Sequence, residues 1–203
     1  AMEVGFVQTT VRAWPALDSR EGRDIILGSF LDAGHSLLRS GFGPRLVYVL
    51  GGANGNDEWQ STVEVYNPLT DAWKQLSNMT TIRSMHGAAV LDGKIYVMGG
   101  AGSARGINGD DDTLSTAEVY DPQSDSWQPL ADMASGRGRF AAAVVSGKIY
   151  AIGGESDAVG TMAAVEAFDP LLGAWAGVAS LSAARKDHAV AVVDGKIYAI
   201  GGL

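Results

Sequence analysis

Short runs of consecutive apolar residues recur along the chain, and most of them end in a pair of glycines. The runs Ala88 to Leu91 and Ile95 to Met98 are continuously apolar rather than alternating with polar residues. A strand shows this pattern when both of its faces are buried. The pattern therefore predicts an all-β fold in which the central strands are covered on both sides.

One of these runs repeats together with its flanking glycines. The sequence GKIYVMGG at 93–100 returns as GKIYAIGG at 147–154 and at 195–202, and 46–52 holds a degenerate copy. The glycine pairs begin at 51, 99, 153 and 201, so the successive steps are 48, 54 and 48 residues. A period of this size indicates a repeat architecture whose units stack on one another.

A second motif lies between the glycine pairs and keeps its own spacing. It reads VEVYNP at 63–68, AEVYDP at 117–122 and VEAFDP at 165–170. In each copy a Trp follows the aromatic residue after seven positions, and an Arg follows that Trp after ten: Trp73 and Arg83, Trp127 and Arg137, Trp175 and Arg185. Loops drift in length while packed strands do not, so the motif predicts a structural unit.

Two kinds of turn punctuate each unit. Asp92-Gly93, Ser146-Gly147 and Asp194-Gly195 stand between two strand-like runs, which predicts tight hairpins with positive φ at glycine. The Asn-Pro or Asp-Pro pair of the second motif predicts the turn of an outer hairpin, because Pro fixes φ and lacks an N–H.

Taken together, these features resemble the kelch family of β-propellers. The resemblance rests on the double glycine, the Glu-x-Tyr/Phe-Asp/Asn-Pro turn, the spaced Trp and the following Arg, and it covers nearly all of 35–203. It implies a kelch-type β-propeller of four-stranded blades. We expect one domain over 1–203, with a degenerate outer hairpin plus an insertion in 1–34 and regular repeats in 35–203.

The first residues leave the number of blades open. Val7 and Trp14 keep the seven-residue step and predict an outer hairpin, while residues 24–31 fit either a short helix or an extra strand. An inner hairpin with three extra residues is expected over 35–52. Since the chain ends with an inner hairpin at 196–202, the two ends would form one composite blade beside three whole blades, giving about four blade equivalents.

Three interpretations of this count remain. The chain forms a closed ring of four blades, or it associates with a second copy that completes a larger ring, or it is a segment of a longer protein.

Composition narrows the classes of partner. A formal charge of −8 and a pI near 4.7 argue against nucleic acid and anionic membranes. The absence of cysteine excludes disulfides, thiolate ligands and a thiol nucleophile. With no signal-peptide pattern or membrane-spanning run, we expect a cytoplasmic location. No cofactor or metal is expected.

Strand direction alternates within a blade, so the connections after the glycine pairs and those between blades should emerge on the same face. The candidate binding residues lie in these connections. The predicted partner-binding residues are Arg83, Arg137, Arg139, Arg185, Trp59 and Glu155. The resemblance to kelch substrate adaptors implies that arginines at or near the Arg83 position bind acidic peptides. A guanidinium group is suited to this because it can form two parallel hydrogen bonds with a carboxylate. An alternative is internal pairing of the recurrent Arg with the recurrent Glu64, Glu118 and Glu166, because a buried charge needs a partner. Trp59 fits either a binding anchor or edge packing.

Two other polar groups fit structural roles. His35, His86 and His188 share a position that Phe140 fills in the remaining unit, which predicts packing rather than metal binding or acid–base chemistry. The acidic run 108–112 lacks the ligand pattern of an EF-hand, so we expect a solvated loop rather than a calcium site.

These observations favour a non-catalytic module that binds a peptide or loop, preferably acidic, because no nucleophile and base stand at motif spacing. One alternative is a small-ligand enzyme of the sugar-acid mutarotase type, which kelch-like propellers include and which would use Arg and Glu. A galactose-oxidase type of site is disfavoured because its Cys-crosslinked Tyr cannot form here. The other alternative is a self-assembling fragment that forms a homo-oligomer.

Overall fold

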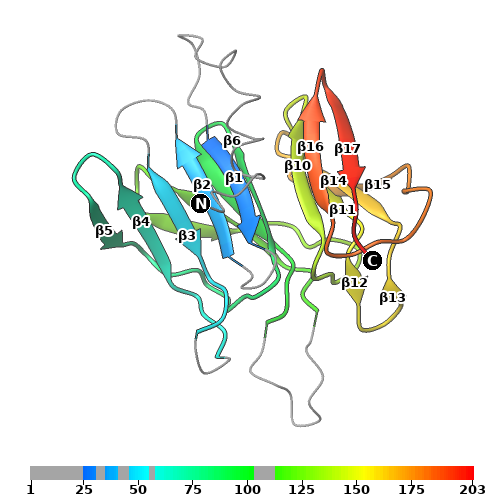
Figure 1. Ribbon diagram of the computed structural model, residues 1–203, viewed down its shortest axis with the longest axis horizontal. Helices are drawn as coiled ribbons and strands as arrows, with labels where there is room; N and C mark the ends of the chain where they lie inside the picture. The colour runs from blue at the N-terminus through cyan, green and yellow to red at the C-terminus, as the bar shows by residue number, and fades with distance from the viewer. Residues whose placement is uncertain (1–24, 31–34, 41–45, 55–57, 103–112) are drawn as a thin grey trace.

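The computed structural model describes residues 25–30, 35–40, 46–54, 58–102 and 113–203, and their regular structure is all β (Figure 1). The described strands, in chain order, are β1 (Ile25–Phe30), β2 (His35–Ser40), β3 (Val47–Leu50), β4 (Val63–Asn67), β5 (Ala72–Gln75), β6 (Gly87–Leu91), β7 (Lys94–Met98), β8 (Ala117–Asp121), β9 (Ser126–Pro129), β10 (Ala141–Val145), β11 (Lys148–Ile152), β12 (Glu155–Ser156), β13 (Gly160–Thr161), β14 (Val165–Asp169), β15 (Ala174–Val178), β16 (Ala189–Val193) and β17 (Lys196–Ile200).

The strands form consecutive antiparallel sheets that follow the sequence repeat. We call β2–β5 blade 1, β6–β9 blade 2, the four strands β10, β11, β14 and β15 blade 3, and β16 with β17 the terminal hairpin. Within each blade the strands pair in chain order. Figure 1 shows blade 1 on one side of the molecule and blade 3 with the terminal hairpin on the other. The prediction of four-stranded antiparallel units is confirmed.

The inner hairpins turn at the predicted dipeptides. Asp92 and Gly93 have φ of 52° and 74°, and the corresponding pairs at 146–147 and 194–195 have closely similar values. Two consecutive positive φ angles define the tight turn whose twist matches that of the flanking strands. Glycine accepts this conformation without strain, and Asp tolerates it better than most residues do.

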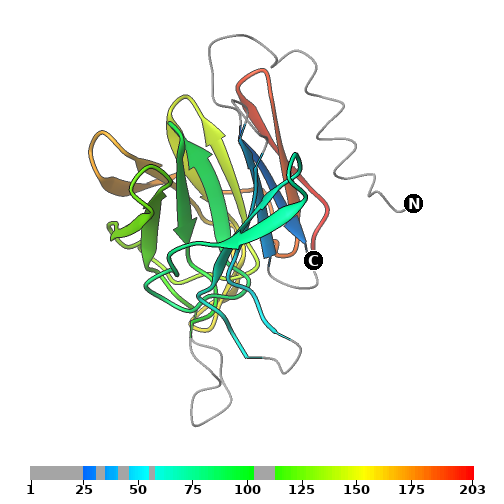
Figure 2. The same ribbon diagram turned by 90° about the vertical axis from the view of Figure 1, so that its left-hand side faces the viewer.

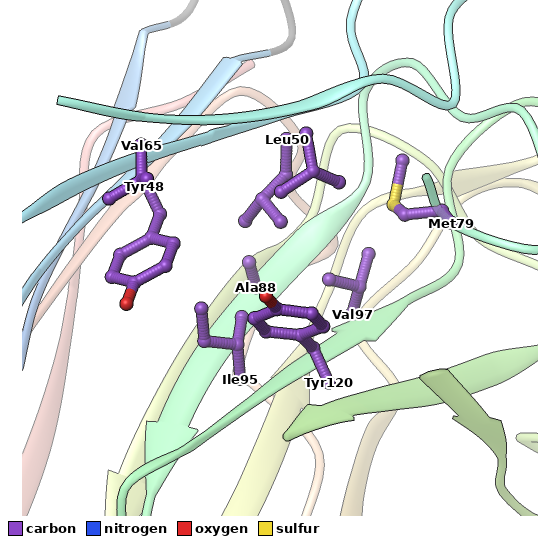
Figure 3. Packing of buried hydrophobic residues seen from close by; sticks show 9 residues of the cluster. Tyr48, Leu50, Val65, Met79, Ala88, Ile95, Val97 and Tyr120 are labelled. Carbon is purple, nitrogen blue, oxygen red and sulfur yellow. The ribbon is translucent and has the colours of Figure 1, made fainter. Parts of the chain in front are cut away.

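The central strands are buried on both faces, as their apolar runs predict. In β7, Ile95 and Val97 pack toward blade 1, while Tyr96 and Met98 pack toward blade 3. Figure 3 shows the first of these contacts, with Tyr48, Leu50, Val65 and Met79 of blade 1 and its outgoing loop facing Ala88, Ile95, Val97 and Tyr120 of blade 2. Burial between blades therefore holds neighbouring sheets together.

The regular spacing of the tryptophans has a direct structural cause. Trp127 on β9 stacks at 5.1 Å on Tyr120 of β8, and its indole N–H donates to the carbonyl of Ser77 beyond blade 1 at 2.8 Å. Trp175 in blade 3 makes the same bond to Ala131 at 2.9 Å. Trp127 and Trp175 thus tie their blades to the preceding blade. The interval to the aromatic residue does not vary because the two residues are cross-strand partners, Tyr66 with Trp73, Tyr120 with Trp127 and Phe168 with Trp175.

The sheet that contains blade 1 has one strand more than the sheets of blades 2 and 3. Residues 25–30 form β1, which pairs with β2 over its full length, so the five-stranded order is β1-β2-β3-β4-β5. Of the two predicted structures for 24–31, the extra strand is the observed one. The three extra residues of the first inner hairpin lie between the strands: Arg39 pairs with Val47 across eight positions, whereas Val90 pairs with Ile95 across five.

The terminal hairpin forms a two-stranded sheet. It packs against blade 3 through Val190 and Ile197, which contact a small cluster of Ala143, Ile152 and Val165. The predicted partner hairpin of the composite blade, in residues 1–17, lies outside the described residues. The number of blades in a closed ring therefore stays a prediction.

Candidate functional site

The connections that follow the glycine pairs and those between blades meet at one end of the molecule. We call this end the loop face; its described parts are 51–54, 58–62, 99–102, 113–116 and 153–164 after the glycine pairs, with 77–86, 131–140 and 179–188 between blades. Backbone bridges join the two sets, pairing Ser84 with Ala101 and Gly138 with Glu155. Figure 2 shows the cyan loop after β3 at the end opposite the tip of the red terminal hairpin. The predicted convergence of these loops is confirmed.

The first recurrent arginine lies beneath this face in a buried ion pair. Arg83 and Glu118 are each 1% exposed, and Arg83 Nε lies 3.1 Å from Glu118 Oε1. The other nitrogens of Arg83 donate to the carbonyls of Gly99 and Thr116 and to the hydroxyl of Thr116. Glu118 Oε2 accepts from the backbone N–H of Thr80 at 2.8 Å and from its hydroxyl at 2.7 Å.

Blade 3 repeats the same arrangement with its own residues. Arg137 Nη2 lies 2.5 Å from Glu166 Oε1, and Arg137 Nη1 donates to the carbonyls of Gly153 and Ala164. Burial lowers the pKa of both Arg83 and Arg137, and in each case the paired carboxylate opposes that shift. The two pairs link the loop that enters each blade to the third strand of that blade.

These contacts correct the prediction that Arg83 and Arg137 face a partner. Both side chains are fully buried, and their guanidinium groups already bind a carboxylate and backbone carbonyls within the chain. The alternative interpretation, internal pairing with the recurrent Glu, is the observed one for Glu118 and Glu166. Glu64 has the same position in blade 1 but is exposed, and the described residues supply no arginine for it.

A second set of charges lies on the surface of the loop face. We call Arg139, Glu155, Lys186 and Asp187 the charged cluster. Arg139 Nε lies 3.1 Å from Glu155 Oε1 and its Nη1 lies 3.7 Å from Asp187 Oδ2, while Lys186 Nζ pairs with Glu155 Oε2. The Arg139 side chain is 42% exposed. The cluster therefore combines two cations and two anions that solvent can reach.

The backbone fixes the position of this cluster. Met85, Arg139 and Asp187 occupy the same position in successive repeats, two residues after the recurrent arginine, and have φ of 54°, 53° and 52°. The N–H of Arg139 donates to the carbonyl of Met85 at 3.0 Å, and the N–H of Asp187 donates to that of Arg139 at 2.9 Å. These bonds run from blade to blade and hold neighbouring charged side chains side by side.

Two predicted partner-binding residues, Trp59 and Arg185, are not members of the charged cluster. Trp59 is partly buried in the loop after β3, where its backbone bridges Ala53, and no observed contact joins it to the charged cluster. Arg185 is partly buried, with Nη1 donating to the carbonyl of Gly201 at 2.7 Å. Sequence reasoning did not select Asp187 or Thr80. Alignment of the repeats on the recurrent arginine would have found both, at fixed offsets of plus two and minus three.

The shared histidine position is a packing site in the described repeats. His86, Phe140 and His188 are all buried next to glycine pairs, where Gly100, Gly154 and Gly202 approach the Cβ of the respective side chain. This agrees with the prediction of packing for His86 and His188. The side chain of His35 lies outside the described residues.

We expect substitution of His188 by phenylalanine to make the fold less sensitive to acid. Burial, and to a lesser extent the charge of Arg185, lowers the pKa of His188 from 6.5, while Asp187 opposes this shift. Below about pH 6.5 the unfolded chain then binds more protons than the folded chain, so stability falls as the pH falls. Thermal unfolding between about pH 5 and 7.5 should show a smaller loss of Tm for H188F. Parallel pH profiles of the two proteins would contradict this.

Among the described residues, no group of three or more His, Asp or Glu side chains is placed to hold a metal ion. The acidic run 108–112 lies outside the described residues. The described part of the chain contains no helix with the length and apolar character needed to cross a membrane.

Comparison with protein families gives one match that spans most of the chain. The family model described as the KLHDC2/KLHL20/DRC7 Kelch-repeats domain matches residues 33–202. The region that it matches includes every blade and the terminal hairpin.

Similar proteins share the repeats over part of their length. Kelch-like ECH-associated protein 1B of Danio rerio is 35% identical over 117 residues, covering 58% of this chain and 19% of that protein. Kelch-like protein 40 of Xenopus laevis is 37% identical over 109 residues, covering 54% and 17% respectively. Kelch-like protein 23 of Homo sapiens is 37% identical over 109 residues, covering 53% and 18%. The chain thus matches less than a fifth of the length of these relatives.

A solved structure has the same fold. The structure of YjhT superposes with a TM-score of 0.68, covering 88% of this chain and 70% of that chain. The sequences are 19% identical, so the likeness concerns the fold alone.

Proposed function

Because the chain belongs to the kelch-repeat family, through the KLHDC2/KLHL20/DRC7 Kelch-repeats domain at residues 33–202, we propose that it binds a segment of another protein on its loop face. One observation carries this proposal. The charged cluster places exposed cations and anions from neighbouring repeats on a backbone that blade-to-blade hydrogen bonds hold in place. Variable loops on such a scaffold are common binding surfaces.

The cluster favours a partner segment that carries carboxylates. Arg139 now shares its guanidinium between Glu155 and Asp187, and the longer of the two contacts, at 3.7 Å, is weak. Exposed ion pairs contribute at most about 1 kcal/mol, so a partner carboxylate can displace one of them at low cost. A planar guanidinium binds such a carboxylate through two parallel hydrogen bonds. Acidic peptides are therefore the proposed ligand class.

The similar proteins support the same class of function. Kelch-like ECH-associated protein 1B is named for its association with ECH. The shared region is the repeat region, which in this chain carries the loop face. We accordingly assign protein binding to the repeats themselves.

Panning a library of random 12-residue peptides on the immobilised chain tests this proposal. The enriched peptides should contain Asp or Glu, and alanine at Arg139 should weaken their binding about tenfold or more, as expected for an arginine at the centre of an interface. Arg139 makes only exposed pairs, so R139A should keep its Tm within a few degrees of the wild type. Fluorescence anisotropy with one enriched peptide measures the change.

Lys148 provides a matched control. It begins β11 at the opposite end of blade 3, is exposed, and pairs with Asp169 at 2.9 Å. K148A removes one positive charge and one surface pair but should leave peptide binding unchanged. Peptides without acidic residues, or binding that R139A and K148A affect equally, would overturn the proposal.

A further inference from the structure

Met85 differs from the other described methionines in its exposure to solvent. Met79, Met98, Met133 and Met162 are buried, with between 1% and 7% of their surface exposed. Met85 is partly exposed and lies in the connection from blade 1 to blade 2, on the loop face. Oxidants in solution reach an exposed sulfur more readily than a buried one. Among the described methionines, Met85 is therefore the one open to oxidation in the folded chain.

The sulfur of Met85 contacts the charged cluster. Arg139 Nε donates to Met85 Sδ at 3.1 Å and lies at the same distance from Glu155 Oε1. The backbone holds this contact in place, because the N–H of Arg139 also donates to the Met85 carbonyl at 3.0 Å. A thioether sulfur is only a weak acceptor. The guanidinium of Arg139 is thus held beside a group whose strength as an acceptor depends on its oxidation state.

Oxidation by hydrogen peroxide turns a thioether into a strong acceptor. A lone pair of the sulfur attacks one peroxide oxygen, the O–O bond breaks and an S–O bond forms. The proton of the transferred hydroxyl goes to the departing hydroxide, so that water leaves. The sulfur has then lost two electrons to the peroxide, and the product is methionine sulfoxide. Its oxygen carries partial negative charge, and it accepts its strongest hydrogen bonds from cations.

We infer that Met85 is an oxidation site, and that its sulfoxide binds Arg139 and thereby weakens the binding of acidic peptides on the loop face. The second part rests on the proposed function, in which Arg139 binds a carboxylate of the peptide. In the oxidised chain the sulfoxide oxygen competes with that carboxylate for the guanidinium. The fold is kept, because Met85 belongs to none of the buried clusters of the described residues. Sulfoxide reductases make the change reversible.

Peptide mapping by mass spectrometry tests the oxidation site. The 203-residue chain is treated with increasing concentrations of hydrogen peroxide, and Met85 should gain one oxygen before any of the four buried methionines does. Met162 is the matched comparison, because it also lies on the loop face but is 7% exposed. Oxidation of Met162 as fast as that of Met85 would overturn the inference.

Methyl NMR tests the contact between the sulfoxide and Arg139 without any peptide. The chain is labelled with 13C at the methionine methyl groups, and the signal that M85L lacks belongs to Met85. After oxidation this methyl group should have a higher order parameter in the wild type than in R139A, because Arg139 holds the sulfoxide oxygen. Equal order parameters in the two proteins would show that the sulfoxide does not bind Arg139, and would overturn the inference.

Fluorescence anisotropy with an enriched acidic peptide tests the effect on binding. Oxidation should weaken binding to the wild type about tenfold, the equivalent of one hydrogen bond to a charged group. Sulfoxide reductases A and B together should restore the affinity, since each reduces one epimer. M85L should bind equally well before and after peroxide treatment, and an equal loss in M85L and wild type would overturn the inference. If the reduced chain binds no acidic peptide, the proposed function fails, while the mapping and the methyl order parameters still decide whether Met85 is the oxidation site and binds Arg139.

Discussion

Replacing Glu118 by alanine is expected to lower the free energy of unfolding by about 3–5 kcal/mol, the cost of leaving one member of a buried ion pair without its partner. Arg83 is 1% exposed and would keep its charge in an apolar interface. The backbone N–H of Thr80 would also lose its acceptor. Urea unfolding followed by tryptophan fluorescence measures the change, and Tm should fall in parallel.

Glu64 is the matched control for this experiment. It occupies the position of Glu118 in blade 1, on the second residue of β4, but its side chain is exposed. E64A should therefore change the free energy of unfolding by no more than about 0.5 kcal/mol. If E64A and E118A are equally destabilising, the loss comes from the strand position and not from the ion pair.

The sequence predicted most of the repeat architecture because its signals are local. Ile95 to Met98 is apolar throughout, and the strand is buried on both faces. Asp92-Gly93 can form the tight turn with two positive φ angles wherever it stands between two strands. β1 was harder to assign, because residues 25–30 have no counterpart in the other repeats and six residues are too few to establish a period.

The candidate site was less predictable because exposure depends on the neighbouring repeat. Arg137 and Arg139 are two residues apart, yet one is buried against Glu166 and the other is exposed in the charged cluster. The recurrence of one Glu and one Arg in each repeat suggested their pairing, but it could not show which arginines remain exposed to solvent. Only the register of the inter-blade loop against the third strand decides this.

The two KIYAI strands also show that local sequence does not determine burial. β11 and β17 form the same hairpin with the same turn, so local sequence fixes their backbone. Their burial differs because blade 2 covers one face of β11 and the terminal hairpin covers the other, whereas the described residues cover β17 only on the face that packs against blade 3. A repeat sequence therefore encodes the strand and the surface that it offers, while the neighbouring sheets determine whether that surface is buried.

We expect the substitution of Gly153 by alanine to lower the free energy of unfolding by about 2–5 kcal/mol. Its φ is +60°, a conformation that costs residues with a Cβ about 1–2 kcal/mol. A Cβ at this position would also lie 2.6 Å from the carbonyl oxygen of Arg185 and 3.0 Å from the His188 ring. Relieving these close contacts should cost about 1–3 kcal/mol more. The Arg185 carbonyl cannot move away easily, because it is part of the backbone and accepts a hydrogen bond from the N–H of Gly154. Equilibrium unfolding in urea measures the sum.

Gly201 separates the two contributions. It occupies the same position after β17, has a φ of +71°, and a Cβ there would meet nothing within 4 Å. G201A should therefore show the conformational cost alone, about 1–2 kcal/mol. The difference between G153A and G201A then measures how closely a following repeat packs on the glycine pair. Equal losses would mean that the loop at Arg185 moves aside freely, and that the blade-to-blade contact at this glycine is not rigid.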